Sequence, residues 1–266
     1  MSSTTKRKFS TQPKIEVPEA LSAFISATMA SFKCCTHDEA HCYRVAISSR
    51  LIAESEAGAD PRLAYIAGLL HDVLDSKLQD ADGSVSAEEQ LRQILSSEKD
   101  FLSVPEVEKV FTIIKNVGYK NIIKEGYDAF KLPVEYRCVQ DADLLDAIGA
   151  IGIARCMAYS GKKNRKLFGL SRTPQAEGIT HAEYMKAQDS TTDSAVDHFF
   201  DKLLTIAPRL TTVRGKQLAQ ERQDYMGVFL KQLDGELADC GDLTSEGLAE
   251  AVDYMLAGPG SGKTAE

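Results

Sequence analysis

The stretch AYIAGLLHDVLD, residues 64–75, decides the fold, because a wide apolar helical stripe in it is interrupted by two polar residues. Asp60 and Pro61 precede it and are typical of a helix start, with Asp60 as the N-cap and Pro61 at the first helical position. Burying His71 and Asp72 within the apolar run is costly unless they are paired or bind a metal. The alternative is a core histidine satisfied by ordinary hydrogen bonds.

An upstream segment carries a second set of polar side chains on a predicted helix, at about 37–57. His37, His41 and Arg44 are spaced at i, i+4 and i+7 and therefore share one face of it. This face is either solvated or holds a metal ligand beside an arginine that faces phosphate.

A downstream helix, predicted over 134–159, places Asp141, Asp143 and Asp146 among apolar neighbours. Three acids so close together repel one another unless a cation gathers some of them, and Asp143 and Asp146, at i and i+3, can reach one site. Helix capping by Asp141 is the structural alternative. The order H…HD…D thus offers two imidazoles and two carboxylates, a set able to hold a divalent metal with positions open for water and substrate.

Helical periodicity is common and strand signals are scarce, so the sequence predicts an all-α protein. The expected organisation is a flexible tail over 1–16, one domain over 17–240 and a partly disordered extension over 241–266. Besides the helices above, we expect helices at about 17–32, from 60 onward, at 86–97, 104–116, 194–206 and 212–235, and a short one after 242. The stretches 79–84, 117–133 and 160–192 are expected to be loops, and 117–133, with its glycines, lysines and aromatics, is typical of a functional loop.

Composition limits the classes of function. The 266 residues carry a net charge of −8 and are 43% hydrophobic, and no apolar run approaches the roughly 20 residues of a membrane-spanning helix. The negative charge argues against nucleic-acid or membrane-surface binding, but local lysines, arginines and a cation still allow a small anionic substrate. The six cysteines form no CxxC pair, which favours reduced thiols and a cytoplasmic location. A zinc site at Cys34, Cys35 and His37 is a weaker alternative.

One motif near the C-terminus is misleading. AGPGSGKT (257–264) satisfies a relaxed phosphate-loop pattern, but such a loop needs a preceding strand and a following helix, and only Ala265 and Glu266 follow. We therefore expect no nucleotide binding there.

Three extended motifs resemble one known superfamily. HDEAHCYRV (37–45), GLLHDVLDSK (68–77) and QDADLLDAIGAIGIAR (140–155) are similar to HD-domain metal-dependent phosphohydrolases, and most of all to their YedJ/YpgQ-like branch. SAVDHFFDKLL (194–204) and TVRGKQLAQERQDYMGVFL (212–230) also match this branch, so the resemblance covers roughly residues 20–235. It implies a helical HD-domain bundle with additional C-terminal helices.

Residue roles follow from the resemblance by motif. The implied metal ligands are His41, His71, Asp72 and Asp143. Asp75 is the implied general base or the group that orients the attacking water, while Arg44 and Lys77 match positions suited to phosphate oxygens. The resemblance also implies that His37, Arg44 and Lys77 bind substrate. Tyr119 and Lys120 are further substrate-binding candidates because they lie in the predicted functional loop, and the segment from Lys120 to Lys124 is a candidate lid.

The implied activity is hydrolysis of a nucleotide by metal-activated water. The branch suggests a nucleoside triphosphate pyrophosphohydrolase and the wider superfamily a 5′-nucleotidase. The mixed nitrogen and oxygen ligands suit one divalent ion, with Mn²⁺ favoured over Mg²⁺, Co²⁺, Ni²⁺ or Fe²⁺. A small phosphorylated substrate is then the expected partner, without nucleic acid or membrane, and the apolar C-terminal helices allow a homo-oligomer.

Departures from the family pattern leave two other functions open. Leu144 stands where an arginine is usual, and Val117–Tyr119 stand where bacterial relatives often carry a sequence like HSF. Leu144 supports a metal-binding regulatory protein that has lost turnover. A dinuclear-iron oxygenase would need further histidines between Asp72 and Asp143, and this chain has none there.

Overall fold

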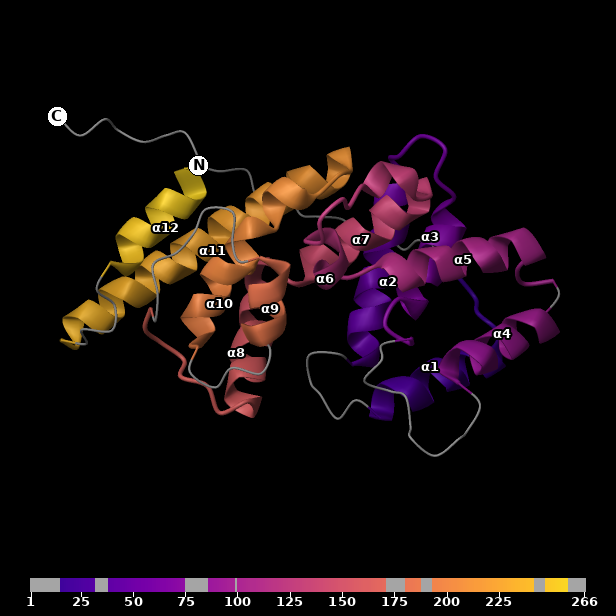
Figure 1. Ribbon diagram of the computed structural model, residues 1–266, viewed down its shortest axis with the longest axis horizontal. Coiled ribbons are helices and arrows are strands. Elements are labelled where there is room, and N and C mark those ends of the chain that lie inside the picture. The colour runs from indigo at the N-terminus through magenta and orange to yellow at the C-terminus, as the bar shows by residue number, and fades with distance from the viewer. Residues whose placement is uncertain are drawn as a thin grey trace, which may run out of the picture.

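The computed structural model describes residues 15–31, 38–74, 86–98, 100–170, 180–187, 193–241 and 247–257. Within these ranges the chain forms helices and no strand, which confirms the predicted all-α class (Figure 1). The α-helices are α1 (Glu19–Ser31), α2 (Glu39–Ala53), α3 (Pro61–Leu70), α4 (Ala87–Ser97), α5 (Val104–Asn116), α6 (Tyr119–Ile122), α7 (Val134–Asp146), α8 (Gly149–Lys162), α9 (His181–Ala187), α10 (Ala195–Asp201), α11 (Val213–Asp239) and α12 (Leu248–Ala257). The 3₁₀ helices are η2 (Ala129–Lys131), η3 (Leu203–Thr205) and η4 (Ala207–Arg209). None of the described helices is long and apolar enough to cross a membrane.

The N-terminal half is built around α3. Helices α1 to α5 and α7 lie on one side of the molecule (right in Figure 1), and α3 packs against α2, α5 and α7. Every residue from Leu63 to Leu70 is buried, so α3 is hydrophobic all round and forms the centre of this half. Each buried leucine or isoleucine there stabilises the fold by about 1.5–3 kcal/mol.

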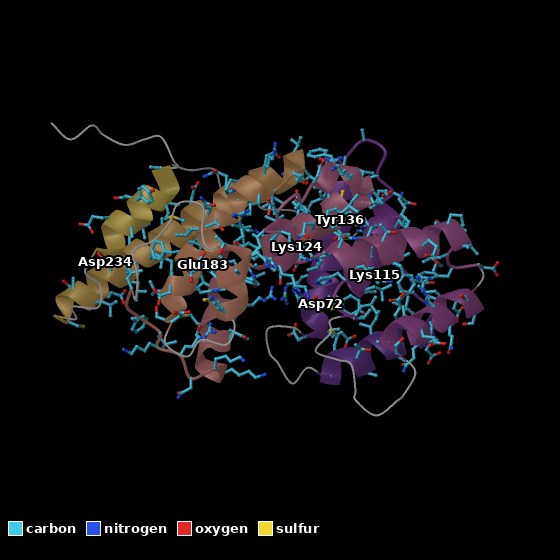
Figure 2. The ribbon with its side chains drawn as sticks, viewed as in Figure 1. Asp72, Lys115, Lys124, Tyr136, Glu183 and Asp234 are labelled. Atoms are coloured by element: carbon cyan, nitrogen blue, oxygen red, sulfur yellow. The ribbon has the colours of Figure 1, made fainter. Side chains whose placement is uncertain are left out.

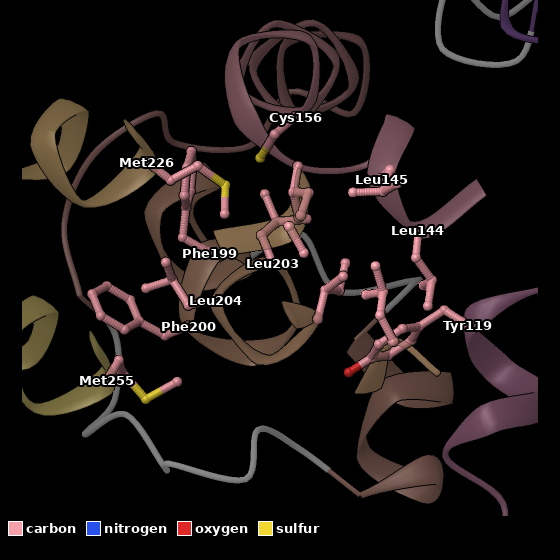
Figure 3. Packing of buried hydrophobic residues seen from close by; sticks show 14 of the residues in the cluster. Tyr119, Leu144, Leu145, Cys156, Phe199, Phe200, Leu203, Leu204, Met226 and Met255 are labelled. Atoms are coloured by element: carbon pink, nitrogen blue, oxygen red, sulfur yellow. The ribbon is translucent and has the colours of Figure 1, made fainter. Parts of the chain in front are cut away.

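The C-terminal half has its own apolar core. Helices α8, α10, α11 and α12 surround the buried Phe199, Phe200, Leu204, Met226 and Met255 (Figure 3). This cluster continues to Leu144 and Leu145 of α7, and α11 also contacts α7. The two halves therefore share α7, the helix that carries the predicted aspartates.

Helix α3 begins as predicted and ends earlier. The Asp60 side chain accepts hydrogen bonds from the backbone N–H groups of Arg62 and Leu63, and Pro61 occupies the first turn. The helix ends at Leu70, so His71 is its C-cap and does not lie inside it as predicted. The pair His71-Asp72 thus sits where the chain leaves the apolar core, and a polar pair can reach a cavity there.

The long helix predicted over 134–159 is wrong, because the chain breaks it into α7 and α8. Gly149 has a φ of +73°, a left-handed conformation that only glycine adopts without strain, and it turns the chain after α7. A Cβ on Gly152 would overlap the carbonyl group of Ala147. These glycines serve a tight turn between two helices.

Other boundaries differ in smaller ways. Helix α2 ends at Ala53 instead of reaching 57, and its N-cap is Asp38. The predicted loop over 117–133 contains α6 and η2, and the irregular stretch over 160–192 contains α9. The predicted loop at 79–84 and the phosphate-loop-like residues 258–264 lie outside the described residues.

Candidate metal centre and its pocket

Three elements bring the predicted metal ligands together. His41 lies in the first turn of α2, where the Asp38 side chain accepts a hydrogen bond of 2.7 Å from the His41 backbone N–H. His71 and Asp72 follow the end of α3, and Asp143 lies on α7. Because α2, α3 and α7 pack on one another, residues more than 100 positions apart in the chain meet near the middle of the molecule, where Figure 2 labels Asp72.

The four side chains converge at short range. Ligand atoms of His41, His71 and Asp143 all lie within 4.8 Å of one another. The two Nε2 atoms are 3.2 Å apart, and the Asp143 Oδ1 lies 3.7 Å from each. Asp72 adds carboxylate oxygens 3.5 Å from the His41 Nε2 and 3.3 Å from the His71 Nε2.

The hydrogen bonds on the far side of each imidazole assign its tautomer. The His41 Nδ1 lies 2.7 Å from a carboxylate oxygen of Asp146, and the His71 Nδ1 lies 2.8 Å from the Gly68 carbonyl oxygen. Both partners only accept hydrogen bonds, so each neutral imidazole carries its proton on Nδ1 and points the Nε2 lone pair at the cluster. Two lone pairs and two carboxylates that face one another favour a bound cation, and a divalent metal fits this donor set.

His41 is held in a strongly negative field. Burial lowers the pKa of its imidazole, but hydrogen bonds with Asp146 and Asp72 outweigh burial and raise that pKa from 6.5 to about 9. The metal-free cluster therefore attracts a proton at the position where a metal would bind. Metal binding must displace this proton, since the ligand is the neutral imidazole.

Asp146 does not join Asp143 at the cluster, although the sequence placed both within reach of one site. Its carboxylate is 6% exposed and binds the His41 Nδ1, two guanidinium nitrogens of Arg44 at 2.8 and 3.0 Å, and Arg155 at 2.8 Å. Burial raises the pKa of Asp146, but the bonds with His41 and Arg44 hold it well below its usual range. Asp146 is thus a charged carboxylate that orients His41 from behind.

Asp141 has a separate, structural role. Its buried carboxylate accepts hydrogen bonds from the backbone N–H groups of Thr211 and Thr212 and from the Thr212 hydroxyl group. Burial raises the pKa of Asp141 to about 6, and these bonds oppose the rise. The capping alternative is wrong, because Asp141 lies inside α7 and the N-cap of α11 is Thr212; Asp141 instead anchors the segment that precedes α11.

A cavity of about 530 Å³ opens beside the cluster, within the usual size range of ligand sites. The four converging side chains line it together with the predicted substrate-binding residues Tyr119 and Lys120. Arg44 is not among its lining residues and binds Asp146 through two nitrogens, so its phosphate contact stays a prediction. His37, Asp75 and Lys77, and also Cys34 and Cys35, lie outside the described residues.

The cavity also contains residues to which the sequence analysis gave no role. Arg155 of α8, Tyr184 of α9, His198 of α10 and Lys202 line its walls. His198 and Lys202 interrupt an apolar segment, which is the same signal that singled out His71 and Asp72. That signal could have marked them as candidates, but their distance along the chain hid the shared cavity.

Comparisons with known proteins agree on one family. The family model of the HD domain matches residues 39–148. The uncharacterized protein YpgQ of Bacillus subtilis is 32% identical over 203 residues, which cover 76% of this chain and 84% of that protein.

Several solved structures also match this chain over most of its length. The crystal structure of Bacillus subtilis YpgQ in complex with ADP matches with a TM-score of 0.59 and 28% identity, covering 81% of this chain and 97% of that one. A Lactobacillus plantarum protein matches with a TM-score of 0.62 and 28% identity, covering 84% and 100%. An HD-superfamily hydrolase of Bacillus thuringiensis matches with a TM-score of 0.57 and 27% identity, covering 83% and 97%.

Proposed function

Because this chain belongs to the HD-domain family, we propose that it is a metal-dependent phosphohydrolase that acts on a nucleotide. The observation that carries the proposal is the cluster of His41, His71 and Asp143, whose ligand atoms lie within 4.8 Å of one another at the edge of a cavity. Asp72 completes the proposed ligand set, with oxygens 3.5 and 3.3 Å from the two Nε2 atoms.

The proposed metal is a single divalent ion, with Mn²⁺ as the first candidate among ions that accept mixed imidazole and carboxylate ligands. Such an ion lowers the pKa of bound water and neutralises charge that develops on a phosphate. The protein holds its ligands in place: Asp146 fixes the ring of His41 and the Gly68 carbonyl group fixes that of His71. Fixed ligands keep the geometry ready without reorganisation during the reaction.

Cations on the other walls favour an anionic substrate in spite of the net charge of −8. Lys115, Lys120 and Arg155 line the same cavity as the cluster. Lys115 and Arg155 are paired with Glu88 and Asp146, so Lys120 is the better candidate for direct contact with phosphate. Asp75 and Lys77, the proposed water-orienting base and a further phosphate contact, remain predictions from the motif.

A nucleotide is the proposed substrate class. YpgQ, which shares the fold over most of this chain, was crystallised in complex with ADP, and this supports a nucleotide here. The pyrophosphohydrolase and 5′-nucleotidase reactions differ in the bond that is cleaved. Release of pyrophosphate from a triphosphate supports the first, and release of orthophosphate from a monophosphate supports the second.

The test is a hydrolysis assay on protein stripped of metal and reloaded with Mn²⁺, Mg²⁺, Co²⁺, Ni²⁺ or Fe²⁺. Nucleoside mono-, di- and triphosphates are each supplied, and orthophosphate and pyrophosphate are measured separately. We expect release with at least one metal and its loss in His71→Ala. If no nucleotide is hydrolysed with any metal, or if His71→Ala retains full activity, the proposed function is wrong.

A further inference from the structure

The cavity has a second wall that the metal cluster does not use. Tyr119 of α6, Tyr184 of α9 and Lys202, which follows α10, all line it. The Lys202 ammonium nitrogen lies 4.8 Å from the centre of the Tyr119 ring and 5.7 Å from that of Tyr184, and the two ring centres are 5.0 Å apart. The metal cluster, in contrast, comes from α2, α7 and the end of α3.

This wall is firmly held. The Tyr119 hydroxyl group lies 3.2 Å from the Thr205 hydroxyl oxygen, and Thr205 donates a 2.8 Å hydrogen bond to the Lys202 carbonyl group. The Lys202 backbone N–H donates to the His198 carbonyl group at 3.1 Å. The backbone at Lys202 is thus fixed from both sides, and a rigid wall can present a charge at a defined place.

The ammonium group of Lys202 lies over two aromatic rings. Among the described residues no carboxylate forms an ion pair with its ammonium group, whose recorded contacts are the faces of the two tyrosine rings. Ring faces stabilise a cation without neutralising it. A half-buried ammonium group that faces a cavity in this way is suited to an anionic ligand.

Two cations, Lys202 and Arg165, act on the neighbouring His198 and Cys156. Burial, and then the charges of Lys202 and Arg165, lower the pKa of His198 to about 3. Burial raises the pKa of the Cys156 thiol, while a bond with Ser160 and the same two cations oppose the rise. Both side chains line the cavity together with Lys202 and Arg165, and the same lining also includes the carboxylates of Asp193 and Asp201.

We propose that Lys202, supported by the rings of Tyr119 and Tyr184, binds a second phosphate of the substrate, one that the metal does not contact. The inference rests on the proposed function, since it assumes that the first phosphate lies at His41, His71, Asp72 and Asp143. It names the substrate class more narrowly, because a second anionic site favours nucleoside di- and triphosphates over monophosphates.

The test measures binding of inorganic tripolyphosphate and of orthophosphate to the Mn²⁺-loaded protein by calorimetry. Lys202→Met removes the charge and keeps most of the stem, Lys202→Arg keeps the charge, and Lys216→Met changes an exposed lysine of α11. We expect Lys202→Met to weaken tripolyphosphate binding by about 10-fold to 100-fold, the range for one charged hydrogen bond, and orthophosphate binding by less than about 3-fold. Lys202→Arg and Lys216→Met should stay within about 3-fold of the parent protein.

Three results would overturn the inference. They are unchanged tripolyphosphate binding in Lys202→Met, an equal loss for both anions, and an absence of tripolyphosphate binding in the parent protein. Circular dichroism of the helices and Mn²⁺ titration check that Lys202→Met is folded. If Lys202→Met does not fold, Lys202→Gln is used in its place.

The two proposals can fail separately. If tripolyphosphate binding depends on Lys202 but no nucleotide is hydrolysed, the proposed function is wrong and the second anion site stands. If triphosphates are hydrolysed and Lys202→Met leaves their KM unchanged, the second anion site is wrong and the proposed function stands.

Discussion

Replacing Asp146 by asparagine should weaken metal binding without removing any metal ligand. The carboxylate accepts from the His41 Nδ1 at 2.7 Å and from Arg44 and Arg155 at 2.8 Å. Asparagine can turn its NH₂ group toward the His41 Nδ1, which then accepts a hydrogen bond and leaves the proton on Nε2, where the metal must bind. Loss of such a partner typically costs about 10-fold to 100-fold in metal affinity.

The same substitution should also lower the free energy of unfolding. Arg44 is 37% exposed, so solvent screens its share, and the loss comes mainly from the bonds with His41 and Arg155. Two charge-assisted hydrogen bonds of this kind correspond to about 3 kcal/mol, with part retained because the asparagine oxygen still accepts from one arginine. We expect a decrease of about 2–3 kcal/mol in urea unfolding of the metal-free protein.

Asp141→Asn is the matched control, since Asp141 is a buried carboxylate on the same helix that binds Thr211 and Thr212 and no histidine. Mn²⁺ titration by calorimetry should give this variant an affinity within about 3-fold of the parent protein. Parent-like Mn²⁺ affinity in Asp146→Asn would refute the orienting role. An equal loss in both variants would assign the effect to distortion of α7.

Three further predictions concern other parts of the molecule. The pKa of His198 is lowered from 6.5 to about 3, so the stability that it contributes is present above pH 6.5 and is lost as the pH falls toward 3. The free energy of unfolding, measured with EDTA present, should therefore decrease as the pH falls over this range. The decrease should be smaller in His198→Gln. Gly152→Ala would overlap backbone and should lower the free energy of unfolding by about 2 kcal/mol or more, whereas Gly161→Ala, in open space on the same helix, should be neutral or stabilising in the same urea assay. Lys120→Ala should raise the KM for the nucleotide several-fold with unchanged Mn²⁺ affinity, while Lys124→Ala, outside the cavity lining, should leave both unchanged; loss of metal in Lys120→Ala would contradict its assignment to substrate.

Local signals in the sequence predicted most helix starts. Asp60-Pro61 predicted the first turn of α3 because an N-cap and a proline act within a few residues of themselves. The break before Gly149 was missed because its left-handed φ has no marker in the local sequence, and the side chain of Arg222 on α11, which packs against Gly149, is distant along the chain. A glycine in an apolar run is compatible with one continuous helix and with a break between two helices, and only the packing of the neighbouring helix distinguishes them.

In the candidate site, too, the orientation of the side chains depends on packing that the local sequence does not reveal. The motifs placed His41, His71, Asp72 and Asp143 together correctly in space, although their role as ligands stays a prediction. The spacing of Asp143 and Asp146 says only that both face the same side of α7. Which of them meets the His41 Nε2 and which meets Nδ1 depends on the direction of the imidazole, and the packing of α2 on α7 decides it.

The charge balance of the cavity indicates that the proposed metal and the lysines would act together. With neutral imidazoles, Asp72 and Asp143 give the cluster two negative charges, which would repel a phosphate. A divalent cation cancels them and leaves the cluster nearly neutral, so it can ligate one phosphate oxygen but does not attract a polyanion from a distance. That attraction must come from cations whose charge is not already used, as the charge of Arg44 and Arg155 is used on Asp146. On this reasoning we expect Lys120 and Lys202 to set a preference for more highly charged nucleotides, which the assays of Lys120→Ala and Lys202→Met test.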